Sequence, residues 1–293
     1  MSYPKVSIVI PSYKPGHFEQ CLKSAIGQTY PNIEIMVSDN CPTEAIREIC
    51  ERYPQVIYQR NTAIREDNLL SCFYSGKGQY IKPLFDDDLL HPFCVERMVA
   101  VMNMDPNVQM VFSASQVINS DNERTETRRP YQVTGSMPGS EMHRSMALGM
   151  RNFVGELSSI MFRREQLWKI APMRLFWYGS HDFTKGLADV AAYCNLVKGG
   201  NAFYVDEELT YFRHDQRLQS NSNINANPNF GYCFSDYIDL LRVSHEEGLI
   251  SQPELASAQG QVEAVCIQLN GVFAQMAPAR QRYLDYLGAL APQ

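Results

Sequence analysis

Three consecutive aspartates, Asp86–Asp88, follow a short apolar segment and are the clearest candidates for chemistry in the 293-residue sequence. Carboxylates this close together repel one another, so a bound cation would relieve a substantial electrostatic penalty. Hard oxygen ligands suit Mg²⁺ or Mn²⁺, which proteins commonly hold through one or two carboxylates together with substrate phosphates. The same triplet could instead be a solvated acidic turn before the helix that Pro92 begins. Taken alone, these residues leave both interpretations open.

Alternating strands and helices would position this triplet. Short segments rich in β-branched residues predict strands at 6–10, 33–37, 55–59, 79–85 and 108–115. Apolar residues at helical spacing predict helices at about 17–28, 43–53 and 66–76, and another from Pro92 onward. This alternation predicts an α/β fold with a mainly parallel central sheet covered on both faces. Ligands of such sheets bind beyond the carboxyl ends of the strands, where Asp39 and the triplet both fall.

The second half of the sequence is less regular. Residues 120–150 are polar and show no clear period, so we interpret them as a loop-rich insert. The pattern then predicts a strand at 157–162 and a helix at 187–197. Residues 219–229 form a polar low-complexity segment that predicts a mobile loop. The pattern over 230–290 predicts two or three helices.

Composition and charge exclude several classes of protein. A formal net charge of −6 argues against nucleic acid as the main partner, because phosphate backbones select basic faces. The eight cysteines lack a CxxC pair or zinc-ligand spacing, which is typical of reduced thiols in a cytosolic protein. The N-terminal residues lack a signal-peptide pattern, and no segment approaches the roughly 20 apolar residues that span a bilayer. The expected location is cytoplasmic, with peripheral contact at the inner face of a membrane left open.

Several motifs occur in an order that resembles the family 2 glycosyltransferases. They are Val-Ser-Ile-Val-Ile-Pro-Ser-Tyr at 6–13, Gln-Thr-Tyr-Pro-Asn-Ile-Glu-Ile at 28–35, Ser-Asp-Asn at 38–40, and Gly-Gln-Tyr-Ile at 78–81 leading into the triplet. The resemblance is close from about 4 to 120, looser from 150 to 215 and absent beyond. It implies an inverting enzyme with the GT-A fold, a nucleotide-binding α/β sandwich with an Asp-x-Asp metal motif. The implied donor is a nucleotide diphosphate sugar, with a UDP-sugar favoured, and the implied cofactor is Mn²⁺ or Mg²⁺.

The resemblance also implies roles on the donor side. Asp39 would hydrogen-bond the base, usually uracil, but Asn40 stands where the family often has a second aspartate, so the base is left open. Asp86 and Asp88 fit the Asp-x-Asp spacing, with Asp88 favoured as the direct metal ligand and Asp87 still a candidate. Arg65 and Asn68 either contact the donor or are ordinary helix-surface residues. The residues expected to contact the nucleotide sugar are Pro11, Ser12, Tyr13, Asp39, Asn40, Arg65, Asn68, Asp86 and Asp87.

An inverting transferase also needs a carboxylate base that deprotonates the acceptor hydroxyl as it attacks. The family places this base late in the domain, at the start of a helix and often as Glu-Asp. Asp189 occupies that place, although Ala188 replaces the first acidic residue of the pair. Asp182, beside His181, is the rival. Either aspartate could instead be a helix-N-terminal carboxylate stabilised by the dipole.

Two further residues lie in segments that resemble the family near the acceptor and the diphosphate. Glu156, in Asn-Phe-Val-Gly-Glu at 152–156, would orient the acceptor, or is a buried carboxylate with no substrate contact. His214, beside Arg213, would contact the metal or the diphosphate, since neutral imidazole is a competent ligand. Residues 214–229 are then expected to form a lid that orders over bound donor.

The expected organisation is a GT-A domain over 1–215, followed by a mobile loop and a helical extension over 216–293. Within the domain, 1–118 is the nucleotide-sugar-binding half and 119–215 the acceptor-side half. The acceptor, whether glycan, lipid-linked or protein, is left open, as is a homodimer. One alternative function is a catalytically silent module that binds nucleotide or glycan. A second is a sugar nucleotidyltransferase, but Pro-Ser-Tyr-Lys-Pro-Gly at 11–16 replaces the glycine-rich loop expected there, and neither GxGxxG nor GxxxxGK occurs.

Overall fold

The computed structural model describes residues 3–64, 66–171, 173–214, 227, 229–269 and 271–290. The chain forms two compact units. The first unit comprises 1–137, 154–173 and 200–215, and the second comprises 138–153, 174–199 and 216–293. The predicted boundary after residue 215 does not coincide with this division, because segments before it pack with the C-terminal helices.

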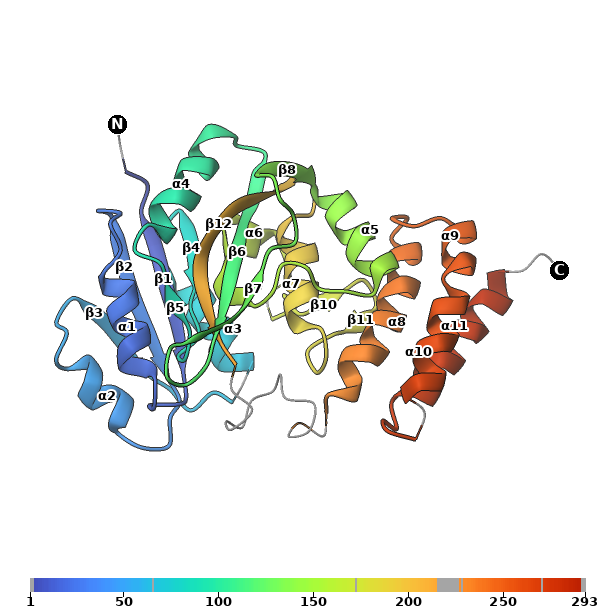
Figure 1. Ribbon diagram of the computed structural model, residues 1–293, viewed down its shortest axis with the longest axis horizontal. Helices are drawn as coiled ribbons and strands as arrows, with labels where there is room; N and C mark the ends of the chain where they lie inside the picture. Colours follow the sequence, from blue (N-terminus) through green and yellow to red (C-terminus); the bar gives the residue numbers. More distant parts are fainter. Residues whose placement is uncertain are drawn as a thin grey trace. The chain divides into compact units, whose positions relative to one another are not determined.

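A ten-stranded sheet forms the centre of the first unit (Figure 1). The main path runs in the order β3-β2-β1-β4-β9-β6-β12-β5, with β7 and β8 paired to β6 and β12. The first four strands are parallel, β9 is antiparallel to both β4 and β6, and β12 is parallel to β6. The strands on this path are β3 (Val56–Arg60), β2 (Ile33–Asp39), β1 (Val6–Ser12), β4 (Tyr80–Pro83), β9 (Ile160–Arg163), β6 (Val108–Ile118), β12 (Asn201–Arg213) and β5 (Leu89–Leu90). The predicted mainly parallel α/β sheet is therefore confirmed.

Helices cover both faces of this sheet. Val6, Ile8 and Ile10 of β1 share one hydrophobic core with α1 and α4, whereas Ser7 on the opposite face lies against Gly76, just after α3. The strand is buried along its whole length, as a central parallel strand requires. The helices of the first unit are α1 (Phe18–Ile26), α2 (Ala45–Cys50), α3 (Glu66–Ser75), α4 (Cys94–Met104), α6 (Glu165–Lys169) and the 3₁₀ turn η1 (Leu157–Ser159).

Pro11 lies inside β1, although the sequence predicted that the strand would end before it. Proline has no N–H to donate to a neighbouring strand. The N–H of Leu84 donates to Val9 O (3.0 Å), so the backbone groups of Val9 and Pro11 face β4. The pairing of β1 with β4 stops at Val9 and Pro83, and the strand therefore continues past Pro11 without losing a sheet hydrogen bond. Pro11 is buried and Ser12 ends the strand.

The segment 120–150 is more regular than the predicted loop-rich insert, and that prediction is wrong. It contains β7 (Arg124–Arg128), which pairs antiparallel with β6, then β8 (Gly135–Pro138) and α5 (Gly139–Gly149). Strand β7 is mostly exposed and therefore lacks the apolar alternation that identifies a strand. Helix α5 buries Met142, His143, Met146 and Ala147 within the second unit.

The second unit is mainly helical. Four C-terminal helices, rather than two or three, occupy the described part of 230–290. They pack in the same compact unit as α5 and α7. No helix in the described residues is long and apolar enough to cross a membrane. The further elements of this unit are β10 (Trp177–Tyr178), β11 (His181–Asp182), α7 (Ala188–Leu196), α8 (Gly231–Glu246), α9 (Gln252–Ser257), α10 (Gln259–Leu269) and α11 (Met276–Leu290).

Candidate active site

Asp39 is the last residue of β2 and is fully buried. Its Oδ1 accepts the N–H of Cys41 (2.7 Å), and its Oδ2 accepts the Tyr58 hydroxyl and Arg60 Nη1 (both 2.7 Å). A carboxylate oxygen can accept two hydrogen bonds, so Oδ1 has room for one more donor. The protein thereby fixes the orientation of Asp39, and its contact with a base stays a prediction.

Asn68 joins the segments that follow β2 and β3. Its Oδ1 accepts Ser38 Oγ (2.7 Å) and Asn61 Nδ2 (2.8 Å), and its Nδ2 donates to Ser38 O and Asn40 Oδ1 (both 3.0 Å). Both amide hydrogens of this buried side chain are therefore used inside the protein. Asn68 fixes the loop that carries Asn40, and a direct contact with the donor would require one of these bonds to break. Arg65 lies outside the described residues.

Asp86 ties the loop after β1 to the aspartate triplet. Its Oδ2 accepts the backbone N–H groups of Tyr13 (2.6 Å) and Lys14 (2.7 Å). Burial, and then the charge of Asp87, raises the pKa of the Asp86 carboxyl to about 6. The Tyr13 side chain is 57% exposed and free to contact a nucleoside, whereas the Ser12 hydroxyl donates back to a main-chain carbonyl.

Asp88 is the most buried member of the triplet. Its Oδ1 accepts the backbone N–H of Arg213 (2.9 Å). The Ser158 hydroxyl lies close enough to the carboxyl to lower its pKa, although no described residue donates a hydrogen bond of normal geometry to the buried Oδ2. Burial, and then the charge of Asp87, raises the pKa of Asp88 well above its ordinary value. A buried carboxylate oxygen without a donor is suited to a divalent cation, which would stabilise the charged form. The residues present therefore fit the predicted metal.

Asp87 is the outermost carboxylate of the three. Its side chain is 23% exposed and lies 3.5 Å from the ammonium nitrogen of Lys14. Because Lys14 also donates its backbone N–H to Asp86, the loop after β1 contacts two members of the triplet. Asp87 is thus accessible to a ligand. The predicted contact between Asp87 and the nucleotide sugar requires such access.

Arg213, the last residue of β12, forms hydrogen bonds with Asp87 and Asp88 of the triplet. Its buried guanidinium donates to Asp87 O (2.8 Å), Asn119 O (2.5 Å) and Asn122 Oδ1 (2.7 Å). Together with the backbone bond to Asp88, these contacts fix the main chain of the metal motif. The sequence alone did not predict this role for Arg213, since its partners lie about 90 and 125 residues away.

Lys82 is a second buried cation near the triplet, and the sequence did not predict its role. It lies fully buried in β4, where its Nζ donates to Pro83 O (2.9 Å) and to Ser158 O. The Ser158 hydroxyl in turn accepts the N–H of Phe85 (3.0 Å). Burial lowers the pKa of Lys82. These bonds connect the chain entering the aspartate triplet to the η1 turn, and a lysine inside a predicted buried strand was the available signal.

Glu156 immediately precedes the η1 turn. Its side chain is 25% exposed and pairs with Arg128 Nη1. The Arg128 guanidinium also lies over the Phe212 ring, 4.8 Å from the centroid. The charge of Glu156 contributes to the raised pKa of Asp88, so the two carboxylates lie within electrostatic reach of each other. The structure brings Glu156 to the same edge as the triplet, and its role in orienting an acceptor stays a prediction.

His214 is the last described residue before 215–226. Its backbone N–H donates to Ile118 O (2.9 Å), and its imidazole stacks on Phe212 with ring centroids 6.1 Å apart and planes at 18°. It directly follows Arg213, whose backbone binds Asp88. Its role at a metal or diphosphate stays a prediction. Most of the expected lid at 214–229 lies outside the described residues.

The two candidate bases belong to the second unit and differ in how they are held. Asp189 lies in the first turn of α7, where its Oδ2 accepts Asn152 Nδ2 (2.7 Å) and its Oδ1 accepts the N–H of Val190 (2.8 Å). Asp182 is exposed, and its Oδ1 accepts both the N–H (3.0 Å) and the hydroxyl (2.5 Å) of Thr184. Asp189 therefore has the environment of an oriented carboxylate, and Asp182 that of a surface turn.

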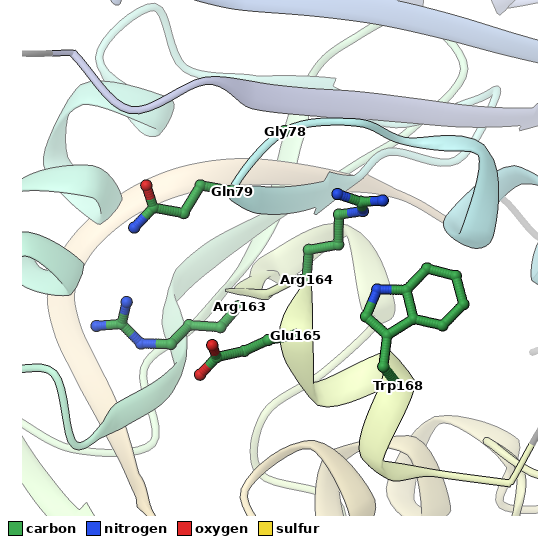
Figure 2. Close-up of a pocket in the computed structure, with 6 residues that line it drawn as sticks. All are labelled: Gly78, Gln79, Arg163, Arg164, Glu165 and Trp168. Atoms are coloured by element: carbon green, nitrogen blue, oxygen red, sulfur yellow. The ribbon is translucent and has the colours of Figure 1, made fainter.

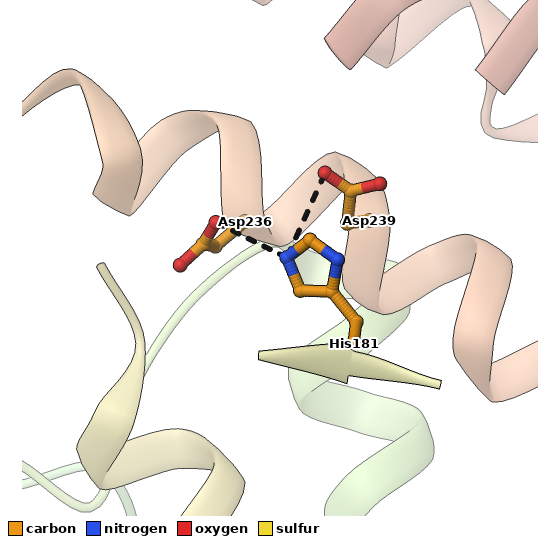
Figure 3. Close-up of side chains that lie close together, drawn as sticks. All are labelled: His181, Asp236 and Asp239. Atoms are coloured by element: carbon orange, nitrogen blue, oxygen red, sulfur yellow. Dashed lines mark ion pairs between the residues drawn. The ribbon is translucent and has the colours of Figure 1, made fainter. Parts of the chain in front are cut away.

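His181, Asp236 and Asp239 form a cluster in the second unit whose potential ligand atoms lie within 4.8 Å of one another (Figure 3). The His181 Nε2 lies 3.5 Å from Asp236 Oδ1 and 3.9 Å from Asp239 Oδ2. Arg282 binds both oxygens of Asp239, through Nε (3.1 Å) and Nη2 (2.5 Å), and Arg242 lies 3.6 Å away. Since guanidinium groups already neutralise Asp239, the geometry favours a buried ionic network over a cation site.

The first unit thus combines a mainly parallel sheet with buried carboxylates beyond its carboxyl edge, which is the GT-A arrangement of glycosyltransferases. Comparison with known families agrees: the model described as "Glycosyl transferase family 2" matches residues 7–171. The chain belongs to glycosyltransferase family 2.

Individual relatives match over different lengths. Protein CgeD of Bacillus subtilis is 29% identical over 135 residues, covering 42% of this chain but only 32% of that protein. The putative teichuronic acid biosynthesis glycosyltransferase TuaG of B. subtilis is 22% identical over 218 residues, covering 72% of this chain and 79% of that protein. The structure of S. aureus TarS 1–349 in complex with UDP-GlcNAc aligns with a TM-score of 0.64 at 12% identity, covering 98% of this chain and 82% of that chain. This structural likeness supports the GT-A fold.

Proposed function

We propose that the chain transfers a sugar from a nucleotide diphosphate donor, with a UDP-sugar favoured, to an acceptor hydroxyl with inversion of configuration. The observation that carries the proposal is the pair of buried carboxylates, Asp86 and Asp88, at the edge of the sheet where Asp39 also ends its strand. A nucleotide sugar at this edge could contact Asp39 with its base and the triplet with its diphosphate. The UDP-GlcNAc bound by TarS, which shares the fold, supports the choice of donor.

Asp86 and Asp88 are the residues proposed to hold Mn²⁺ or Mg²⁺, with His214 as a further candidate. When bound, such a cation would supply positive charge that stabilises the departing nucleotide diphosphate. Arg213 and Lys82 do not need to touch the donor, because their hydrogen bonds fix the main chain on either side of the triplet. The protein thereby pre-organises carboxylates that would otherwise repel one another.

Asp189 is the proposed base that accepts the proton of the acceptor hydroxyl. The amide of Asn152 binds Oδ2 and the N–H of Val190 binds Oδ1, so the carboxylate is held in one orientation at the start of α7. Asp182 remains the rival, and Glu156 is the proposed residue that orients the acceptor. In an inverting reaction the base and the departing diphosphate lie on opposite faces of the transferred sugar, so a single displacement suffices.

The deciding experiment is a donor screen that measures stabilisation by nucleotide sugars and the release of nucleotide diphosphate. With Mn²⁺ or Mg²⁺ present, one donor should stabilise the wild-type protein and be slowly hydrolysed. Asp88→Asn should lower that rate roughly 10²–10³-fold, the range seen when one charge-stabilising group is lost. Asp285→Asn, an exposed carboxylate on α11, is the matched control and should not change it.

Two results would contradict the proposal. If no nucleotide sugar stabilises or reacts with wild type in the presence of metal, the transferase function has no support. If a donor binds tightly but releases no diphosphate even with candidate acceptors, the chain is a catalytically silent binding module. Asn40 and Ala188, which replace acidic residues expected from the family resemblance, keep this second function open.

A further inference from the structure

A separate hollow of about 220 Å³ lies in the first unit, away from the aspartate triplet (Figure 2). Gly78 and Gln79 precede β4, whereas the triplet follows it, and Arg163 pairs with Tyr80 at the start of that strand. The hollow is therefore at the opposite edge of the sheet from the proposed donor site. Its lining residues are Gly78, Gln79, Arg163, Arg164, Glu165 and Trp168.

The two arginines of this hollow differ in their partners. Arg163 is committed to the fold, since it donates to Val108 O (2.7 Å), Met102 O (2.7 Å) and Asp105 O (3.1 Å). Arg164 is half-buried, and its Nε is buried without a hydrogen-bond partner among the described residues, which also place no carboxylate in an ion pair with its guanidinium. A partly desolvated guanidinium without an acceptor is unfavourable, and an anion entering the hollow would relieve this cost.

Trp168 supplies an apolar surface beside this cation. Trp168 is 60% exposed, and the Arg164 guanidinium lies 5.7 Å from the centre of its ring. Figure 2 shows the two side chains next to each other, with Gln79 and Glu165 also lining the hollow. Tyr74 packs edge-on against the indole with ring centroids 5.4 Å apart, which supports its orientation. An indole face packs well against the C–H groups of a sugar ring, while the amide and carboxylate can bind hydroxyls.

We propose that this hollow binds one sugar unit that carries an anionic group, either a carboxylate or a phosphate. Arg164 would pair with the anion, Trp168 would pack on the ring, and Gln79 and Glu165 would bind hydroxyls. The volume is below the roughly 300–1,000 Å³ of pockets for drug-sized ligands, which limits the occupant to about one ring. Neutral sugars lack the group that satisfies Arg164, so they should bind more weakly.

The role of this site in glycan synthesis rests on the proposed function, but binding itself does not. A glycan acceptor or product with acidic units would be held at a second point, remote from the reacting atoms. Two attachments on one molecule raise the effective concentration of the second contact. The site would thus favour acidic glycans without contributing a group to the chemistry.

The test uses the full chain with Trp177→Phe, so that Trp168 is the remaining tryptophan and reports binding by fluorescence. Glucuronate, glucose 6-phosphate and glucose are titrated separately, without nucleotide sugar or metal. A saturable change with glucuronate or glucose 6-phosphate, and a weaker one with glucose, is the expected result. Which acidic sugar binds identifies the carboxylate or the phosphate as the recognised group.

Substitutions made in the Trp177→Phe protein identify the residue that binds the acidic sugar. Arg164→Gln should weaken binding of the acidic sugar roughly tenfold, the effect of losing one charge-assisted pair. Arg97→Gln, an exposed arginine paired with Glu207, is the control and should leave affinity unchanged. Equal affinity for glucose, no saturable change with either acid, or unaltered binding by Arg164→Gln would each overturn the proposal. Donor hydrolysis by Arg164→Gln should match wild type, so failure of this site and failure of the transferase function are distinguishable.

Discussion

The two edges of the sheet in the first unit use charge in opposite ways. At the carboxyl edge the carboxylates of Asp86 and Asp88 are buried, and the nearby cations Lys82 and Arg213 are bound to carbonyl oxygens of the protein. At the amino edge the guanidinium of Arg164 lacks such a partner among the described residues. One edge is therefore suited to a cation and the other to an anion.

This difference distinguishes two kinds of cationic side chain. One kind stabilises the main chain around a site through hydrogen bonds to the protein, and the other has donors available to a ligand. A buried arginine whose donors are all directed at the protein stabilises the surrounding main chain, whereas an uncommitted one lowers stability unless a ligand pairs with it. Burial alone does not distinguish the two cases, because both arginines have buried polar atoms. The hydrogen-bond partners do, and they can be tested by substitution.

The largest expected effect is a contrast between Arg213→Met and Arg164→Met. Loss of the Arg213 guanidinium leaves buried acceptors at Asp87 and Asn119 unpaired and should lower the free energy of unfolding by about 3–5 kcal/mol. Arg164→Met removes a guanidinium that contacts the exposed Trp168 ring but has no hydrogen-bond acceptor at Nε, and should change it by less than about 0.5 kcal/mol. Chemical denaturation of the three proteins measures this, with Arg213→Lys expected to retain part of the stability. Equal losses in the two methionine variants would remove the basis of the comparison.

The pH dependence of stability tests the carboxyl edge. The pKa of Asp86 is raised from 3.8 to about 6, chiefly by burial, so between these values the folded state keeps a proton that the unfolded chain releases. Its contribution to the free energy of unfolding therefore falls as pH rises from about 4 to about 6, by about 3 kcal/mol at most. Asp86→Asn keeps an oxygen for the N–H groups of Tyr13 and Lys14, and should lose this part of the slope.

Denaturation from pH 4 to pH 7 without divalent metal measures the difference between wild type and Asp86→Asn. Asp88 also has a raised pKa, so part of the pH dependence should remain in the variant. Asp285→Asn is the control and should follow the wild-type curve. Parallel curves for wild type and Asp86→Asn would show that burial does not shift this carboxyl as described.

Sequence alone could predict the parallel half of the sheet and the carboxylates at its edge. The strand 6–10 is a continuous buried run. Asp86 directly follows one predicted strand and Asp39 lies two residues after another, so topology places both at the carboxyl edge of the sheet. The exposed strand β7 could not be predicted in the same way, because one solvated strand has no apolar alternation. Local pattern identifies what a segment buries and says little about a segment that buries almost nothing.

The supporting residues of the site were also beyond local pattern. Arg213 binds Asp88 across 125 residues of sequence, and Lys82 reaches Ser158 across 76. Nothing within either segment specifies such a partner, although Lys82 is a cation in a strand that is buried throughout. The carboxylates that carry chemistry occur in a recognisable motif, whereas the residues that hold them are defined only by the folded chain.

The smallest expected effect is the stabilisation of the folded chain by Mn²⁺, which should depend on the carboxyl edge of the sheet and not on the amino edge. Mn²⁺ at about tenfold above its dissociation constant should raise the free energy of unfolding by about 1.4 kcal/mol, because only the folded chain assembles the site. Asp88→Asn should abolish this gain, since the unpartnered Oδ2 supplies the favoured ligand. Arg164→Gln, at the opposite edge, should keep it. Unchanged stabilisation of Asp88→Asn, together with its loss in His181→Gln, would instead assign the cation to the cluster with Asp236 and Asp239.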